Sequence, residues 1–480
     1  MRRGHFSPDD LPAWSVLNDV AFVNVKVADI KGRGYGLVAE RDLVAKDDDT
    51  ESPTLLTIPK DIILSVKHVE QYAKENKSFR QLLDAVGHQS TRGSILLFLL
   101  TQQVLASPDY EGGLGPSTPW TQYFSILPTQ VPIPTMWTEL ELSRLKNTSL
   151  ESAVSAKLTV LTREFDDLRA SLSELAYWND LLTIDEAITI RDWILLDALF
   201  RSRSLELPKS GESMVPGLDL VNHSSKATAY YDENDKGKAV LHLREGCSVA
   251  RGDEITIDYG RDKSPAEMLF SYGFIDIDST TRSLTLPLEP LDDDPLAKPK
   301  LAVFGKPPKL QITEGESGVA RWNGDFVYLM CLNEEDGLDF KVVQETNGSN
   351  HLKMFWQDSD ITNPSDTFKS IIQGHELYPI FELRALTVVL IITSHQLEEL
   401  VAGQENNVTP GSVRPEIWQA ATQLRLIETS ILERSIKAFE DQVSPNPGVL
   451  GVLGIHNTIN PVLQQSTITL YEFFSSMECY

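Results

Sequence analysis

Cysteine is scarce in this sequence, with only Cys247, Cys331 and Cys479 among 480 residues. The three lie far apart and show neither C-x-x-C nor C-x-C spacing. The pattern therefore predicts neither a disulfide framework nor a zinc cluster, and it favours a reducing compartment.

Basic residues are also few, because 43 Lys and Arg stand against 69 Asp and Glu, for a net charge of −26. Binding to a nucleic-acid backbone needs clustered Lys and Arg, so we expect no nucleic-acid partner. A basic protein or peptide fits this charge better. Acidity that only keeps the protein soluble explains it equally well, and both interpretations stay open.

Long apolar runs are missing as well. The most apolar helical stretch, residues 95–100, is far shorter than the roughly 20 residues of a membrane span, and the N-terminus turns acidic before any apolar signal region. We expect no membrane association. With 41% apolar residues over 480 positions, the chain can bury a large core in two or three units.

The hydrophobic pattern changes its period along the chain. Strand-like alternation occupies residues 21–65 and returns over 215–275, with helical spacing between them. A Pro-rich stretch at 286–310 precedes long helical patterns at 370–403 and 412–441. We predict an α+β protein in five parts: an N-terminal β part at 21–75, a helical insertion at 76–205, a second β part at 206–285, a linker at 286–310 and an all-helical domain at 311–480.

Four short segments carry the chemical signal: Gly32-Arg33-Gly34-Tyr35-Gly36, Asp219-Leu220-Val221-Asn222-His223-Ser224, Glu254-Ile255-Thr256-Ile257-Asp258-Tyr259-Gly260 and Tyr272-Gly273-Phe274. The glycines do not predict a phosphate loop, because no helix and no Lys-Ser/Thr follow them. Two interpretations of the glycine segment stay open: a tight turn between strands, and a turn whose backbone, free of side chains, can approach a cofactor.

The other segments have ordinary interpretations too. His223 has no second His or Cys at ligand spacing, so we predict no metal site. Asn222 and His223 could simply satisfy buried backbone groups, and Tyr259 could simply pack in a sheet.

In this order and spacing, the four segments resemble the SET-domain protein methyltransferases. The resemblance implies S-adenosylmethionine as cofactor, bound by Gly34, Tyr35, Gly36, Arg203, Asn222, His223 and Tyr259. It also implies that the Asn222 and Tyr259 segments cross in a pseudoknot, that Tyr259 is the catalytic tyrosine, and that a helical insertion splits the SET fold ahead of a helical substrate-binding domain.

Further motifs are similar to the branch that includes the Rubisco large-subunit and fungal ribosomal-protein lysine methyltransferases. They are Pro119-Trp120-Thr121-Gln122-Tyr123-Phe124-Ser125-Ile126-Leu127-Pro128, Met136-Trp137-Thr138-Glu139-Leu140-Glu141-Leu142, Arg201-Ser202-Arg203 and Arg425-Leu426-Ile427-Glu428. The resemblance implies that Arg203 pairs with the donor's carboxylate, and that Asp219, Tyr272 and either Tyr230 or Tyr231 line the lysine channel.

The chemistry explains a tyrosine in such a site. Methyl transfer from a sulfonium to an amine is an in-line displacement, so geometry and preorganised electrostatics carry the acceleration. An apolar channel and a nearby cation lower the pKa of the attacking amine, so no dedicated base is needed. A hydroxyl can then orient the amine and the methyl group through hydrogen bonds.

The resemblance implies a protein-lysine N-methyltransferase with a ribosomal or translation-related target. The cysteine-rich segment of the histone-methylating branch is absent, which favours a non-histone substrate. We expect a basic protein substrate, a monomer, and a location in the cytoplasm, the nucleus or both. Two alternatives stay open: a catalytically silent SET scaffold that binds a protein, and a protein-histidine methyltransferase.

Overall fold

The computed structural model describes residues 4–45, 52–87, 90–110, 117–182, 187–291, 294–315, 318–344, 349–362, 367–403 and 413–443. The chain forms two compact units. The first comprises Met1–Arg144, Leu150–Thr280 and Val413–Ala420, and the second comprises Leu145–Ser149, Thr281–Ser412 and Ala421–Tyr480. The part of the predicted C-terminal domain after residue 443, including Cys479, lies outside the described residues.

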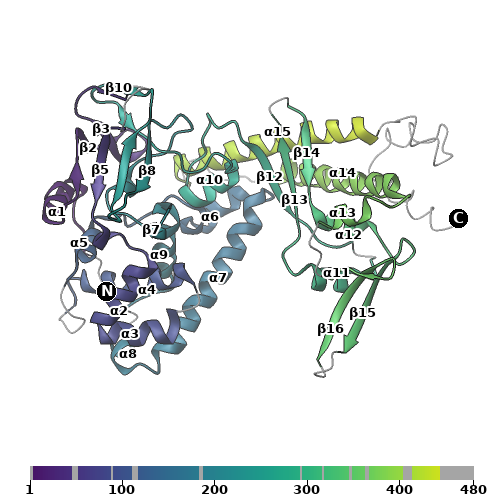
Figure 1. The fold of residues 1–480 in the computed structure, drawn as a ribbon, viewed down its shortest axis with the longest axis horizontal. Helices are drawn as coiled ribbons and strands as arrows, with labels where there is room; N and C mark the ends of the chain where they lie inside the picture. The colour runs from purple at the N-terminus through teal and green to yellow at the C-terminus, as the bar shows by residue number, and fades with distance from the viewer. Residues whose placement is uncertain are drawn as a thin grey trace. The chain divides into compact units, whose positions relative to one another are not determined.

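Short strands form the β part of the first unit (Figure 1). They are β1 (Ala21–Phe22), β2 (Val25–Ile30), β3 (Gly34–Ala39), β4 (Leu43–Val44), β5 (Thr54–Ile58), β6 (Ser204–Leu207), β7 (Gly211–Met214), β8 (Ala229–Glu233), β9 (Ala239–Leu243), β10 (Ser248–Val249) and β11 (Glu254–Ile255). They pair in small antiparallel sheets ordered β1-β5-β9-β8, β11-β3-β2, β10-β4 and β6-β7. Strands from both predicted β parts therefore share sheets.

Helices fill the interval between the two sets of strands. They are α2 (Val66–Glu75), α3 (Lys77–Leu82), α4 (Thr91–Leu105), α5 (Pro119–Ile126), α6 (Glu139–Leu142), α7 (Ser149–Leu172), α8 (Ala176–Leu182) and α9 (Ile190–Arg203), with α1 (Leu11–Leu17) before the strands and α10 (Pro265–Tyr272) after them. Helix α4 is buried almost all round, as its continuous apolar run predicts. Its side chains join the strands in one core.

The described part of the second unit contains helices and two sheets. Its helices are α11 (Ala297–Phe304), α12 (Asp325–Cys331), α13 (Phe368–Ile372), α14 (Tyr378–Ala402) and most of α15 (Pro415–Val443), and its strands are β12 (Arg282–Pro287), β13 (Lys309–Glu314), β14 (Ala320–Asn323), β15 (Leu338–Gln344), β16 (Asn350–Trp356) and β17 (Ser359–Asp360). The helical patterns predicted at 370–403 and 412–441 correspond to α14 and α15. The prediction that the C-terminal domain is all-helical is nevertheless wrong, because this unit also contains β12 to β17.

The segment 286–310, predicted as a linker, is instead structured. It contains the end of β12, all of α11 and the start of β13, and β12 pairs with β13 from Arg282↔Glu314 to Pro287↔Lys309. Lys300 within it is fully buried and pairs with Asp294 at 2.6 Å. Proline is compatible with this arrangement because Pro287 lies at the end of a strand, where a ladder hydrogen bond can be missing.

Helix α14 is long and apolar enough to cross a membrane by length and composition alone. Its side chains Phe381, Ala385 and Val389 are fully buried in the core of the second unit. One face of α14 therefore packs within the second unit.

Gly273 ends α10 in a left-handed conformation, with φ of +83°. A Cβ there would lie 2.8 Å from the backbone of Pro132. We expect Gly273→Ala to lower the free energy of unfolding by about 2 kcal/mol or more, because backbone strain and overpacking add. Gly252→Ala is the matched control, since its φ is +91° but nothing lies within 4 Å. If urea unfolding gave the same loss of stability for the two variants, the contact with Pro132 would add nothing to the cost of Gly273→Ala.

Glu428 gives the second unit a specific pH dependence. It accepts hydrogen bonds from Ser149 Oγ at 2.5 Å and Ser149 N at 3.1 Å, and burial raises its pKa from 4.5 to about 7. The folded state therefore holds a proton that the unfolded state releases, so stability is lost as pH rises from about 4.5 to about 7.

We expect this loss to reach roughly 3 kcal/mol, at about 1.4 kcal/mol per pKa unit. In Glu428→Gln it should be absent, because the amide does not ionise. Urea unfolding of both proteins at pH 5 and pH 8 measures the difference. Identical pH dependence in the two proteins would contradict the assignment.

Candidate active site

The glycine segment forms the turn between β2 and β3. The two strands pair from Val25↔Ala39 to Ile30↔Gly34, and Arg33 N donates to Ile30 O at 2.8 Å. Gly32 and Gly34 have φ of +76° and +73°, which residues with side chains rarely adopt. The structure therefore places these glycines in a tight turn between two strands, which is one of the two interpretations left open by the sequence.

Gly36 serves a different purpose from the turn glycines. A Cβ at this position would lie 2.7 Å from Asn222 Nδ2 and 2.9 Å from Glu254 Oε1. The missing side chain lets β3 approach the Asn222 segment closely, so the end of the glycine segment and Asn222 are neighbours.

The Asn222 and Tyr259 segments run side by side. His223 and Ile257 form a parallel bridge, in which Ile257 N donates to Asn222 O at 3.0 Å and Ser224 N donates to Ile257 O at 2.9 Å. The hydroxyl of Tyr259 donates to Val221 O at 2.8 Å. This is the pairing that the predicted pseudoknot requires.

The ring of His223 joins the two segments through a side chain as well. Its Nδ1 accepts a hydrogen bond from Tyr259 N at 3.0 Å, and its Nε2 lies 3.0 Å from Asp276 Oδ2. Because Nδ1 accepts, the ring proton is on Nε2, which donates to the carboxylate. His223 thus fixes the backbone of Tyr259.

Aromatic rings surround Tyr259. The ring centroids of Tyr272, His223 and Phe274 lie 4.6, 5.2 and 6.5 Å from its own. Burial raises the pKa of Tyr259 well above its usual value and that of Tyr272 to about 12, the latter with a smaller contribution from Tyr231. Both hydroxyls are therefore protonated at neutral pH.

Strand β8 separates the two candidate channel tyrosines. Successive residues of a strand face opposite sides, so Tyr230 and Tyr231 diverge. Tyr231 is close enough to affect the pKa of Tyr272, whereas the Tyr230 ring lies 5.4 Å from the His242 ring and 5.9 Å from the Arg244 guanidinium. The structure brings Tyr231 to the aromatic cluster and leaves Tyr230 on the other side.

Arg203 and Asp219 pair with each other. Arg203 Nη1 lies 3.1 Å from Asp219 Oδ2, and the side chain of Asp219 is only 1% exposed. Its Oδ1 accepts from Tyr123 Oη at 2.5 Å and from Gly217 N at 3.0 Å. Asp219 was predicted to line the lysine channel, but its carboxylate is enclosed by these donors and holds Arg203.

A buried charge cluster anchors α9, the helix that ends at Arg203. Asp197 pairs with Arg92, Lys157 and Arg201 at 2.7, 2.9 and 3.3 Å. Burial alone would raise the pKa of Asp197, but the three cations hold it below its usual value. Arg201 also donates to Phe270 O at 2.9 Å, which connects α9 to α10 and so to Tyr272.

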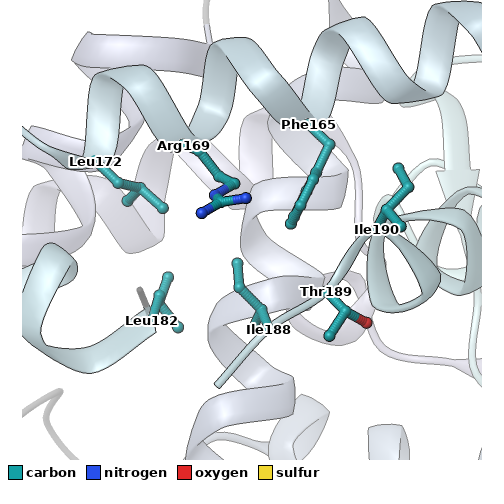
Figure 2. Close-up of a pocket in the computed structure, with 7 residues that line it drawn as sticks. All are labelled: Phe165, Arg169, Leu172, Leu182, Ile188, Thr189 and Ile190. Atoms are coloured by element: carbon teal, nitrogen blue, oxygen red, sulfur yellow. The ribbon is translucent and has the colours of Figure 1, made fainter. Parts of the chain in front are cut away.

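The pocket drawn in Figure 2 lies apart from these four segments in sequence. It has a volume of about 200 Å³, and its lining residues, labelled in Figure 2, are Phe165, Arg169, Leu172, Leu182, Ile188, Thr189 and Ile190. Within the described ranges, no group of His, Cys, Asp and Glu could hold a metal ion.

Sequence reasoning missed Tyr123 and Glu254 as parts of the site. In the sequence, Tyr123 is only one residue of the motif at 119–128, and Glu254 is only the first residue of the segment that contains Tyr259. Their contacts with Asp219 and Asn222 join residues 96 and 32 positions apart. No local pattern signals such pairs.

The hydroxyl of Tyr123 should contribute measurably to stability. In Tyr123→Phe the ring still packs, but the buried Asp219 carboxylate loses a donor, at a cost of about 1–3 kcal/mol. Tyr231→Phe is the control, because no described residue bonds the Tyr231 hydroxyl; its effect should stay within about 0.5 kcal/mol. Equal stabilities of the two variants in urea would contradict the role of the Tyr123–Asp219 bond.

Comparisons with known proteins bear on this geometry. A scan against models of protein families finds no match. The chain is 27% identical over 401 residues to SET domain-containing protein 8 of Schizosaccharomyces pombe, covering 82% of this chain and 87% of that protein. It is 27% identical over 311 residues to the Rubisco large-subunit N-methyltransferase of Pisum sativum, covering 62% of this chain and 58% of that protein.

A more distant similarity of 21% over 463 residues connects the chain to the actin-histidine N-methyltransferase of Danio rerio, covering 91% of this chain and 68% of that protein. The crystal structure of the SET domain of LSMT bound to lysine and AdoHcy matches with a TM-score of 0.63 at 21% identity, covering 96% of this chain and 99% of that one. The predicted α+β SET fold is confirmed. The chain is thus similar in sequence to SET-domain proteins of the branch that includes the Rubisco large-subunit methyltransferase, and it shares the fold of the LSMT SET domain.

Proposed function

We propose that this chain is an S-adenosylmethionine-dependent protein-lysine N-methyltransferase that acts on a basic, non-histone protein. The observation that carries the proposal is the parallel pairing of the Asn222 and Tyr259 segments, which places a tyrosine hydroxyl beside an Asn-His pair and an aromatic cluster. The pea relative is named for methylating the Rubisco large subunit, and the LSMT structure contains lysine and AdoHcy.

The described residues fit the methyl donor. The glycine turn is open, since a Cβ at Gly32 or Gly34 would meet nothing within 4 Å. The carboxamide oxygen of Asn222 has no donor among the described residues, so it can accept one from an ammonium group. Arg203 has N–H groups beyond those that Asp219 occupies, and a guanidinium is suited to a carboxylate.

The aromatic residues would act on the substrate. When bound, the donor supplies a methyl group on a cationic sulfur. Tyr259, Tyr272 and Phe274 provide a half-buried apolar wall that disfavours an ammonium and so lowers the pKa of an incoming amine. The neutral hydroxyl of Tyr259 is positioned by Val221 O and can orient the reacting groups. No dedicated base is required.

The charge of the chain supports a basic substrate. The net charge is −26, and near the aromatic cluster Glu206 pairs directly opposite Glu212 in the β6–β7 hairpin. Burial and the Glu206 charge raise the pKa of Glu212. A cationic peptide would relieve this repulsion. A ribosomal or translation-related protein, rich in lysine, is the target we propose, in the cytoplasm or nucleus.

A histidine acceptor is the second candidate, favoured by the similarity to an actin-histidine N-methyltransferase. A catalytically silent scaffold is less well supported. The residues that the family resemblance assigns to the donor and to catalysis are all present, and the described structure brings Asn222, His223 and Tyr259 together.

Replacing Tyr259 should separate catalysis from folding. We expect Tyr259→Phe to reduce methyl transfer at least 100-fold, the scale for losing a preorganised hydroxyl in a transition state. Transfer of labelled methyl from S-adenosylmethionine into an extract that lacks the endogenous enzyme measures this. Mass spectrometry of the labelled band then identifies the modified residue and separates lysine from histidine.

Tyr177→Phe is the matched control, because it removes a tyrosine hydroxyl from the helical insertion and should leave transfer unchanged. Full transfer by Tyr259→Phe would overturn the catalytic assignment. Absence of both transfer and S-adenosylhomocysteine binding in the wild-type protein would favour the scaffold.

A further inference from the structure

Glu254 lies where the glycine turn meets the Asn-His segment. Its Oε1 accepts a hydrogen bond from Asn222 Nδ2 at 2.7 Å, and its Oε2 pairs with Arg33 Nη1 at 2.6 Å. Arg33 also donates to the carbonyl oxygen of His223. A single carboxylate, 15% exposed, thus connects both segments.

These contacts fix which way the Asn222 amide points. The amide faces Glu254 Oε1 at 2.7 Å and Tyr35 O at 3.4 Å, and both of these oxygens are acceptors only. The group that faces them must therefore be the NH2. Oδ1 then points away from them, and no described residue donates to it.

Gly36 keeps this arrangement compact. A Cβ at Gly36 would lie within 3.0 Å of both Asn222 Nδ2 and Glu254 Oε1, so a side chain there would displace the pair. The ion pair with Arg33, which is 40% exposed, contributes little by itself. The main effect of Glu254 therefore passes through Asn222.

We propose that Glu254 is a positioning residue, which holds the Asn222 amide so that Oδ1 accepts a hydrogen bond from the α-ammonium group of the methyl donor. The proposal rests on the proposed function. Without the carboxylate the amide can flip, and its NH2 would then face a cation. Glu254 therefore determines affinity for the amino-acid end of the donor and not for its adenosine end.

Two compounds separate these ends. S-adenosylhomocysteine carries the α-ammonium group, whereas 5′-methylthioadenosine has the adenosine and sulfur but no amino-acid part. We expect Glu254→Ala to raise the Kd of S-adenosylhomocysteine about 10- to 100-fold, the scale of a hydrogen bond to a charged group. The Kd of 5′-methylthioadenosine should stay within about twofold. Isothermal titration calorimetry measures both.

Two variants control the test. Asp253→Ala removes the same charge one position earlier, from an exposed side chain with no partner among the described residues, and should leave both Kd values unchanged. Glu254→Gln keeps an acceptor oxygen for Asn222 and should give an intermediate Kd for S-adenosylhomocysteine.

Three other results would contradict the proposed role of Glu254. Equal weakening of both compounds by Glu254→Ala would show that Glu254 only maintains the fold, and no change in either would show that it is idle; both results overturn the proposal. A wild-type protein that binds neither compound would overturn the proposed function, and the proposal with it.

Discussion

The parallel pairing of the Asn222 and Tyr259 segments is the contact on which the site depends. Strand β11 ends at Ile255, so no long strand holds Tyr259 in place. Its position comes from the bonds of Ile257 to Asn222 and Ser224, and from the bond of its own N–H to His223. These bonds therefore hold the Asn222 and Tyr259 segments together.

Each of the three polar side chains Arg203, Asn222 and His223 contacts a carboxylate. Asp219 holds Arg203, Glu254 holds Asn222, and Asp276 holds His223. Each acceptor fixes one geometry of its partner and compensates the cost of desolvating it. The site is thus oriented before any ligand arrives, and preorganisation of this kind is what an electrostatically assisted displacement requires.

The sequence contained the motif segments and the change of hydrophobic period, so the SET fold and the neighbourhood of Gly36, Asn222 and Tyr259 could be predicted. The sheet that contains β12 and β13 was missed because the prolines around these strands outweighed the alternation of Leu284, Leu286, Leu310 and Ile312. The choice between Tyr230 and Tyr231 depended on which face of β8 meets α10. Glu254 and Tyr123 act through partners distant in sequence, which periodicity does not reveal.

Burial of the tyrosines connects the fold to the chemistry. The environment that raises the pKa of Tyr259 and Tyr272 penalises charge of either sign. A phenolate is disfavoured there, and so is the ammonium form of an entering amine. The same desolvation thus keeps the hydroxyls as neutral hydrogen-bonding groups and favours the amine that carries a lone pair. A charged base placed in this wall would have to be buried as well, and it would meet the same desolvation cost.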